Sequence, residues 1–154
     1  MVTVPAGYNL LRLVVIGASS HASESDRFNV TVNAVSSGYD TQSAYGQNTS
    51  AAAGVQGNAA IWQGPTNDIP AASATSGVAG ILDLQIPAYA ATTFDKIGLW
   101  RSGYSDAATA AGDQLAQQNI VSLRSGTAAI TSITVTLGLG GNFVTGTTAL
   151  LYLS

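Results

Sequence analysis

Charge is the scarcest property of this chain. Only 8% of its 154 residues are Asp, Glu, Lys or Arg, and it has a single lysine and a single histidine. An average soluble chain carries about 25% charged residues. Like-charge repulsion helps to keep proteins apart in solution, so a surface this poor in charge resists association weakly. We therefore expect a homo-oligomer or a component of a larger assembly.

Other absences exclude whole classes of protein. The chain has no cysteine, which excludes a disulfide framework and thiolate metal sites. Its net charge of −3 and isoelectric point near 4.6 argue against a nucleic-acid partner. No apolar run approaches the roughly 18 residues of a membrane span, and no basic segment of a signal peptide is visible. We expect a protein made in a cytoplasm, without a membrane partner.

The apolar residues fall in short runs bounded by Gly, Pro, Ser and Asn. In the segment 27–33, Phe28, Val30 and Val32 alternate with polar residues, a pattern typical of an antiparallel strand with one solvated face. About eight such segments predict an antiparallel β-sandwich of jelly-roll type, with no helix. The expected strands are 10–16, 27–33, 58–63, 80–86, 94–101, 119–124, 130–137 and 147–153.

The domain limits follow from the first strand. Residues 10–154 should form a single β-sandwich domain, and residues 1–9 an N-terminal extension or arm. Residues 34–77 are ambiguous, and we expect one or two strands there with a long excursion that reaches a neighbour. Pro70 excludes a central strand at its position. Residues 105–115 read as a loop because of Gly112 and their Ser, Thr and Asp content.

Groups able to perform chemistry are few. His21 could act as a base only with a nucleophile and an orienting acid, and a solvated loop histidine is the simpler interpretation. Asp83 and Asp95 could form a glycosidase pair only on neighbouring strands facing one cleft; otherwise each lies on a solvent face or pairs with an arginine. Asp106 and Asp113 lie too far apart in sequence for one calcium loop.

The glycines of residues 138–141 are not followed by a helix, so they indicate a tight turn and not a phosphate cradle. With so few groups, we predict no enzymatic activity, no cofactor and no metal.

Aromatic residues are the better candidates for a contact site. Trp62, Tyr39, Tyr45 and Tyr104 could stack on a glycan or anchor a partner. Trp62 is followed by Gly64 and Pro65, which favours a position at the surface. For this residue an interface anchor and a core side chain both remain open. Trp100 lies in an expected strand, where burial is the simpler interpretation.

Several short motifs resemble a domain of structural proteins from tailed bacteriophages, found at the C-terminus of tail or fibre proteins or alone on the virion. The resemblance spans most of the chain, although residues 42–77 carry little of it. The matching segments are LLRLVVIG at 10–17, the strand at 28–33, GYD at 38–40, IPAYAATTF at 86–94 with Lys96, GNF at 141–143 and LYL at 151–153.

This resemblance implies a trimeric β-sandwich located in the virion, assembled in the host cytoplasm, and it transfers no catalytic residue. Because the domain is nearly the whole chain and lacks a fibre shaft, a capsid decoration (cement) protein that stabilises the shell is the expected function. Its partners would be the major capsid protein or tail proteins. The N-terminal extension and the middle third are the expected arms. The alternative is a tail or fibre-tip receptor-binding module that uses Trp62 and nearby tyrosines to bind carbohydrate.

Overall fold

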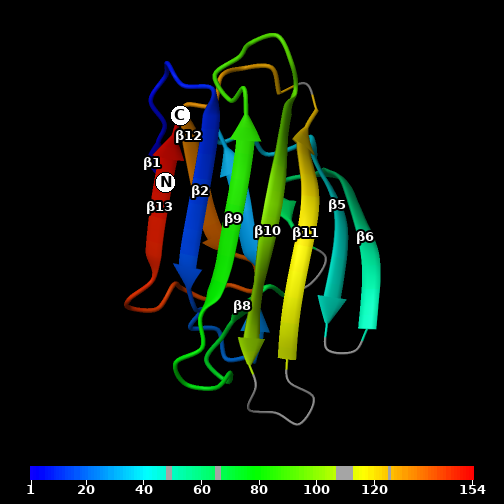
Figure 1. Cartoon of the computed structure of the whole chain (residues 1–154), viewed down its shortest axis with the longest axis vertical. Coiled ribbons are helices and arrows are strands. Elements are labelled where there is room, and N and C mark those ends of the chain that lie inside the picture. Colours follow the sequence, from blue (N-terminus) through cyan, green and yellow to red (C-terminus); the bar gives the residue numbers. More distant parts are fainter. Residues whose placement is uncertain (48–49, 65–66, 107–112, 125) are drawn as a thin grey trace.

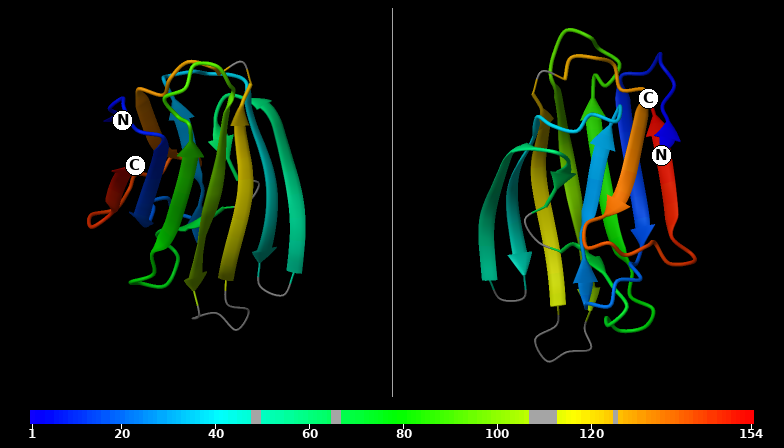
Figure 2. Two further views of the ribbon diagram at one scale, coloured as in Figure 1. Left: turned by 45° about the horizontal axis from the view of Figure 1, so that its top comes forward. Right: turned by 180° about the vertical axis from the view of Figure 1, so that it is seen from behind.

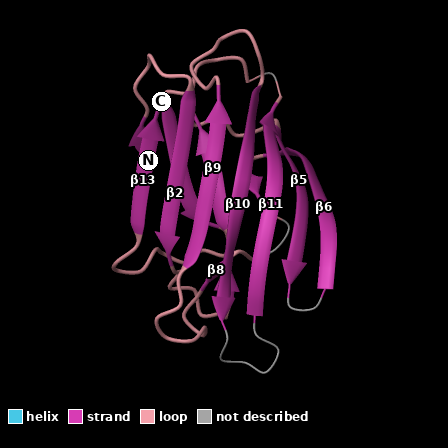
Figure 3. Ribbon diagram, in the orientation of Figure 1, coloured by secondary structure: helices cyan, strands magenta, loops and turns pink. Residues whose placement is uncertain are grey.

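Thirteen strands and no helix make up the described part of the chain in the computed structural model (Figure 3). The structure describes residues 1–47, 50–64, 67–106, 113–124 and 126–154, with the backbone alone described at 113–118. The strands are β1 Val2–Thr3, β2 Leu10–Gly17, β3 Ser25–Asp26, β4 Phe28–Val32, β5 Tyr39–Gln47, β6 Ser50–Ala59, β7 Trp62–Gln63, β8 Ile69–Pro70, β9 Gly80–Pro87, β10 Lys96–Asp106, β11 Asp113–Leu123, β12 Ser132–Leu137 and β13 Thr148–Leu153.

A seven-stranded antiparallel sheet forms the larger layer, in the order β13-β2-β9-β10-β11-β5-β6 (Figure 1). Its centre is a meander of β9, β10 and β11, in which Trp100 lies opposite Leu84 on one side and Asn119 on the other. The sheet ends at β13 on one edge and at β6 on the other. The two edges therefore come from the C-terminal segment and from the middle third of the sequence.

The smaller layer is a four-stranded sheet in the order β1-β12-β4-β7, and it lies behind the larger sheet (Figure 2). A two-stranded sheet, β3-β8, stands beside these layers. The antiparallel β-sandwich predicted from the sequence is therefore confirmed. Nine strands have five or more residues and four have two, so the strand number exceeds the expected eight, and the seven-and-four division differs from an eight-stranded jelly roll.

The core lies between the two layers and is filled by the alternating residues that predicted the strands. Phe28, Val30 and Val32 of β4 are buried, and their polar neighbours in the strand are half-buried. Leu82, Leu84 and Ile86 of β9 are fully buried against them. Alternation identified these strands because one face of each strand packs in the core and the other does not.

The middle third contains more strand than expected. Two long strands, β5 and β6, pair as a hairpin from Tyr39 to Ala59, and β7 and β8 follow. The small sheet reaches this hairpin through β7, whose Trp62 packs against Tyr39 of β5, and β6 is exposed on both faces along most of its length. Pro70 lies in the two-residue strand β8 of the small separate sheet, which agrees with its predicted exclusion from a central strand.

Two further expectations concern the loop at 105–115 and the segment 1–9. The loop predicted at 105–115 is shorter, because β10 continues to Asp106 and β11 begins at Asp113; Gly112 lies outside the described residues. Residues 1–9 pack on their own domain, because β1 pairs with β12 and Val4 is buried. The backbone N–H of Val4 donates to the Thr131 carbonyl at 2.8 Å, so the part of this segment around Val4 is attached to the small sheet, whereas its other residues are exposed.

Candidate functional site

The aromatic candidates lie mainly inside the sandwich. Trp62 and Tyr39 are fully buried, and their rings meet edge to face with centroids 5.2 Å apart. The Trp62 Nε1–H donates to the Ser122 carbonyl at 2.7 Å, and the Tyr39 hydroxyl accepts from the Val32 N–H at 2.9 Å. The expectation that Trp62 lies at the surface is wrong, and its alternative interpretation as a core side chain is confirmed.

The two remaining aromatic candidates do not complete a platform. Tyr104 is 9% exposed on β10, and Tyr45 on β5 is half-buried. Tyr45 shares its side of β5 with Tyr39, because residues separated by an even number of positions point to the same face of a strand. Pro65, whose position suggested surface exposure, lies outside the described residues. The structure therefore brings two of the four aromatic candidates together, within the core.

His21 lies in the half-buried segment before β3. Its Nδ1 is 2.7 Å from the Ser23 hydroxyl, and that hydroxyl donates to the Ser25 carbonyl at 2.5 Å. Because the Ser23 proton is directed to a backbone carbonyl, these contacts arrange the turn and do not form a nucleophile with its base.

The two carboxylates considered for glycoside hydrolysis are not a pair. Asp83 lies in β9 opposite Arg101 and makes a two-bond ion pair with Arg12 at 2.9 Å. Asp95 lies in the exposed loop segment before β10, whose first residue is Lys96. The predicted alternative for Asp83, an ion pair with an arginine, is confirmed. Asp95 is exposed to solvent, as its own predicted alternative stated.

The backbones of Asp106 and Asp113 pair in register at the end of the β10–β11 hairpin, although seven positions separate them in sequence. The Asp106 carboxylate accepts from the Thr75 N–H at 2.8 Å. Among the described residues, no group of three or more acidic or histidine side chains could hold a metal ion. At 138–141 the structure has a turn, with Gly140 at φ +87°, a value that glycine adopts readily.

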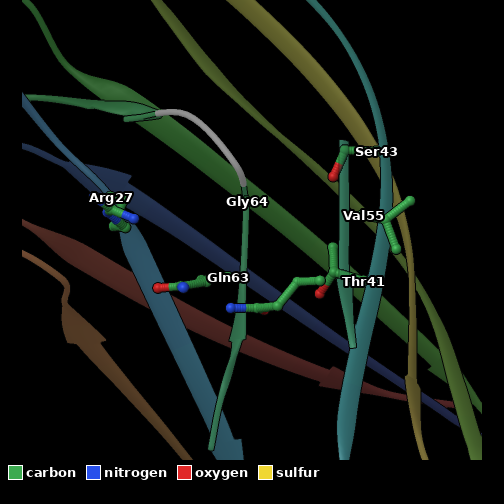
Figure 4. A pocket seen from close by; sticks show the side chains of 7 residues that line it. Arg27, Thr41, Ser43, Val55, Gln63 and Gly64 are labelled. Carbon is green, nitrogen blue, oxygen red and sulfur yellow. The ribbon is translucent and has the colours of Figure 1, made fainter. Parts of the chain in front are cut away.

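Sequence reasoning missed a polar pocket at the open side of the sandwich. We call it the inter-sheet pocket: a cavity of about 210 Å³ lined by Arg27, Thr41, Ser43, Val55, Gln56, Gln63 and Gly64. Figure 4 shows Arg27 and Gln63 on one side and Thr41 and Ser43 on the other, while the side chain of Val55 points away from them. The lining residues come from both layers. Arg27 precedes β4, and Gln63 and Gly64 lie at the end of β7. The remaining residues belong to β5 and β6.

Four polar atoms of the inter-sheet pocket have no hydrogen-bond partner within the part of the chain that the structure describes: Arg27 Nε, Thr41 Oγ1, Ser43 Oγ and Gln56 Oε1. Thr41 is 1% exposed and Ser43 is 7% exposed. Asn119, opposite Ser43 on β11, is also buried with both amide atoms unpartnered. Each such group costs about 1–3 kcal/mol unless water or a ligand satisfies it. The inter-sheet pocket therefore contains several buried donors and acceptors that are available to bind water or a ligand.

A second feature is the face of the seven-stranded sheet that points away from the core, which we call the outer face. It carries large apolar side chains that are 42–79% exposed. Neighbours in register lie side by side on it, with Leu99 opposite Ile120 and Ile16 opposite Ile81. The full set is Ile16, Val55, Ile81, Ile97, Leu99, Ile120, Leu150 and Tyr152.

Two ion pairs lie among these apolar residues. Arg12 pairs with Asp83, and Arg124 pairs with Asp40 at 2.5 Å. The hydrogen bond from Arg124 is the main reason why the pKa of Asp40 falls to about 2. Beside this second pair lies a groove of about 420 Å³, whose apolar walls are Val55, Ile97 and Ile120. Pairing offsets the charge of these two arginines, while the exposed Arg101, opposite Asp83 in register, adds one more positive charge to the outer face.

No family model, curated protein or solved structure matches the chain. The described residues contain no helix that is long and apolar enough to cross a membrane.

Proposed function

We propose that the chain is a structural protein of a tailed-bacteriophage virion, a capsid decoration protein that binds and stabilises the shell as a homotrimer. The sequence resemblance supplies the class of assembly. The outer face supplies the observation that carries the proposal, because an exposed apolar face of this kind is typical of a protein–protein contact. Leu99 and Ile120, at 43% and 53% exposure in register, lie near its middle.

The edge strand β6 supports association with further copies. It contains no charged residue and no proline, the two devices that commonly protect an edge strand from pairing. Its side chains are mostly Ala, Gly and Ser and are exposed on both faces, so another backbone can approach closely. In this proposal β6 makes the contact with a neighbouring copy that the sequence analysis expected of the middle third.

The decoration function predicts hundreds of copies of the chain per particle. Quantitative mass spectrometry of purified virions measures this number against the major capsid protein. A handful of copies would contradict the proposal and favour a tail position. The receptor-binding alternative gains nothing from Trp62, because that side chain is buried and cannot stack on a glycan at the surface.

The contact itself is tested with the double variant Leu99→Ser, Ile120→Ser. Removing two apolar side chains from a contact should lower binding to undecorated particles by at least about tenfold, while urea unfolding changes little. The matched control is Phe94→Ser, which removes an apolar side chain that is 69% exposed in the loop before β10. Unchanged binding of the double variant would contradict a contact through the outer face.

Deleting residues 1–9 would not test the contact. The deletion removes β1, the buried Val4 and the carbonyl of Pro5, which accepts from the Tyr89 hydroxyl at 2.5 Å. Loss of binding in that variant would follow from a destabilised domain, so point variants of the outer face are the informative ones.

A further inference from the structure

The inter-sheet pocket has the properties of a small binding site. Its unpartnered atoms come from strands that are distant in sequence yet converge on one cavity, with Arg27 from one layer and Thr41, Ser43 and Gln56 from the other. Thr41 and Ser43 are more than nine-tenths buried. Native proteins rarely leave several buried polar atoms unsatisfied at one place, so water or a ligand must satisfy this cluster.

The lining chemistry defines the class of occupant. Two hydroxyls both donate and accept, the Gln56 oxygen accepts, and the Arg27 Nε–H donates. Among the described residues that line the cavity none is acidic, and Arg27 is the charged member of the set. Oxygen acceptors at the wall disfavour a multiply charged anion such as phosphate, whereas a ligand bearing several hydroxyls matches donors and acceptors together.

The size of the cavity limits the ligand. Drug-sized ligands occupy pockets of about 300 Å³ or more, and this one has about 210 Å³. It would hold about seven water molecules at about 30 Å³ each. We propose that the inter-sheet pocket binds one neutral sugar residue, whose hydroxyls pair with Thr41, Ser43, Gln56 and Arg27. This inference does not depend on the proposed function, because a shell protein and a tail protein can both carry such a site.

The test uses the full chain and a panel of neutral monosaccharides, with glucose, galactose, mannose, fucose and N-acetylglucosamine, monitored by saturation-transfer NMR and by titration of backbone amide shifts. At least one sugar should bind saturably, with a dissociation constant on the order of 1 mM for so small a ligand. The shifted amides should belong to β5, β6 and β7. Inorganic phosphate serves as a second probe.

Two variants remove single polar groups with little change of shape. Thr41→Val and Gln56→Leu should each weaken sugar binding by about five- to tenfold, the effect of one lost hydrogen bond. The control Thr31→Val makes the same substitution on β4, in which Thr31 is half-buried and lies opposite Thr134, and should leave binding unchanged. Thr41→Val should unfold at the same urea concentration as the parent or higher, because it removes an unpartnered buried hydroxyl.

Three results would overturn the inference. The first is the absence of saturable binding by any sugar of the panel, which would assign the pocket to water. The second is binding that both pocket variants leave unaltered. The third is tight binding of phosphate with none of sugar, which would make Arg27 the centre of an anion site. Copy number in the virion has no bearing on these outcomes, so failure here is distinguishable from failure of the proposed function.

Discussion

The buried carboxyl of Asp68 makes the stability of this protein depend on pH in an uncommon direction. Asp68 is fully buried between β8 and its neighbours. It accepts from the Phe28 N–H at 2.8 Å and from the Ser102 hydroxyl at 2.6 Å, and Ser102 accepts from Trp100 Nε1 at 2.7 Å. Burial outweighs these bonds and raises the pKa of Asp68 from 3.8 to about 7.

The sign follows from proton binding. Between pH 4 and pH 7 the folded state holds a proton on Asp68 that the unfolded state has released, so the free energy of unfolding falls as pH rises through this interval. A shift of about three pKa units corresponds to roughly 4 kcal/mol at most. Between pH 5 and pH 8 the expected loss is on the order of 2–3 kcal/mol.

Urea unfolding followed by tryptophan fluorescence at several pH values measures this loss. The matched variant is Asp68→Asn, whose amide cannot ionise. At pH 5 it should be less stable than the parent by about 1 kcal/mol, because the Ser102 hydroxyl loses its acceptor. At pH 8 the order should reverse. Equal pH dependence of parent and variant, or a parent that gains stability toward pH 8, would refute the reasoning.

Two further variants test the core. Lys96→Met should lower the free energy of unfolding in urea by about 2–3 kcal/mol, because the buried ammonium donates to the carbonyls of Ala91, Phe94 and Thr127. An unchanged free energy of unfolding would mean that these hydrogen bonds do not stabilise the loop. Trp62→Phe should cost about 1–3 kcal/mol through the lost bond to Ser122 and lost volume. An unchanged urea midpoint in that variant would contradict the burial of the indole.

The sequence predicted those strands that have one buried face. In β4 and β9 the apolar alternation reports directly on burial, so the period of two was sufficient. It failed for β6, where both faces are exposed and Ala and Gly show no alternation. That strand forms because its backbone pairs with β5, and pairing leaves little trace in side-chain type.

The candidate sites were harder to predict because they depend on contacts between distant segments. Trp62 stands beside turn residues, yet its partner Ser122 is 60 positions away. The inter-sheet pocket joins Arg27 to Thr41 and Gln56, residues that have no signature of their own. Asp106 and Asp113 are too far apart in sequence for one calcium loop, and their pairing in register depends on the β10–β11 hairpin.

The position of Lys96 determines how the neighbours of this protein can be mapped. It is the one lysine of the chain, it is 2% exposed, and burial lowers its pKa. Reagents that couple lysine side chains will therefore find no accessible lysine here, and a cross-linking map of a particle that relies on lysine side chains would under-represent the protein even where it is abundant. Tyrosine-directed coupling at Tyr8 and Tyr152, which are 46% and 52% exposed, would report its contacts.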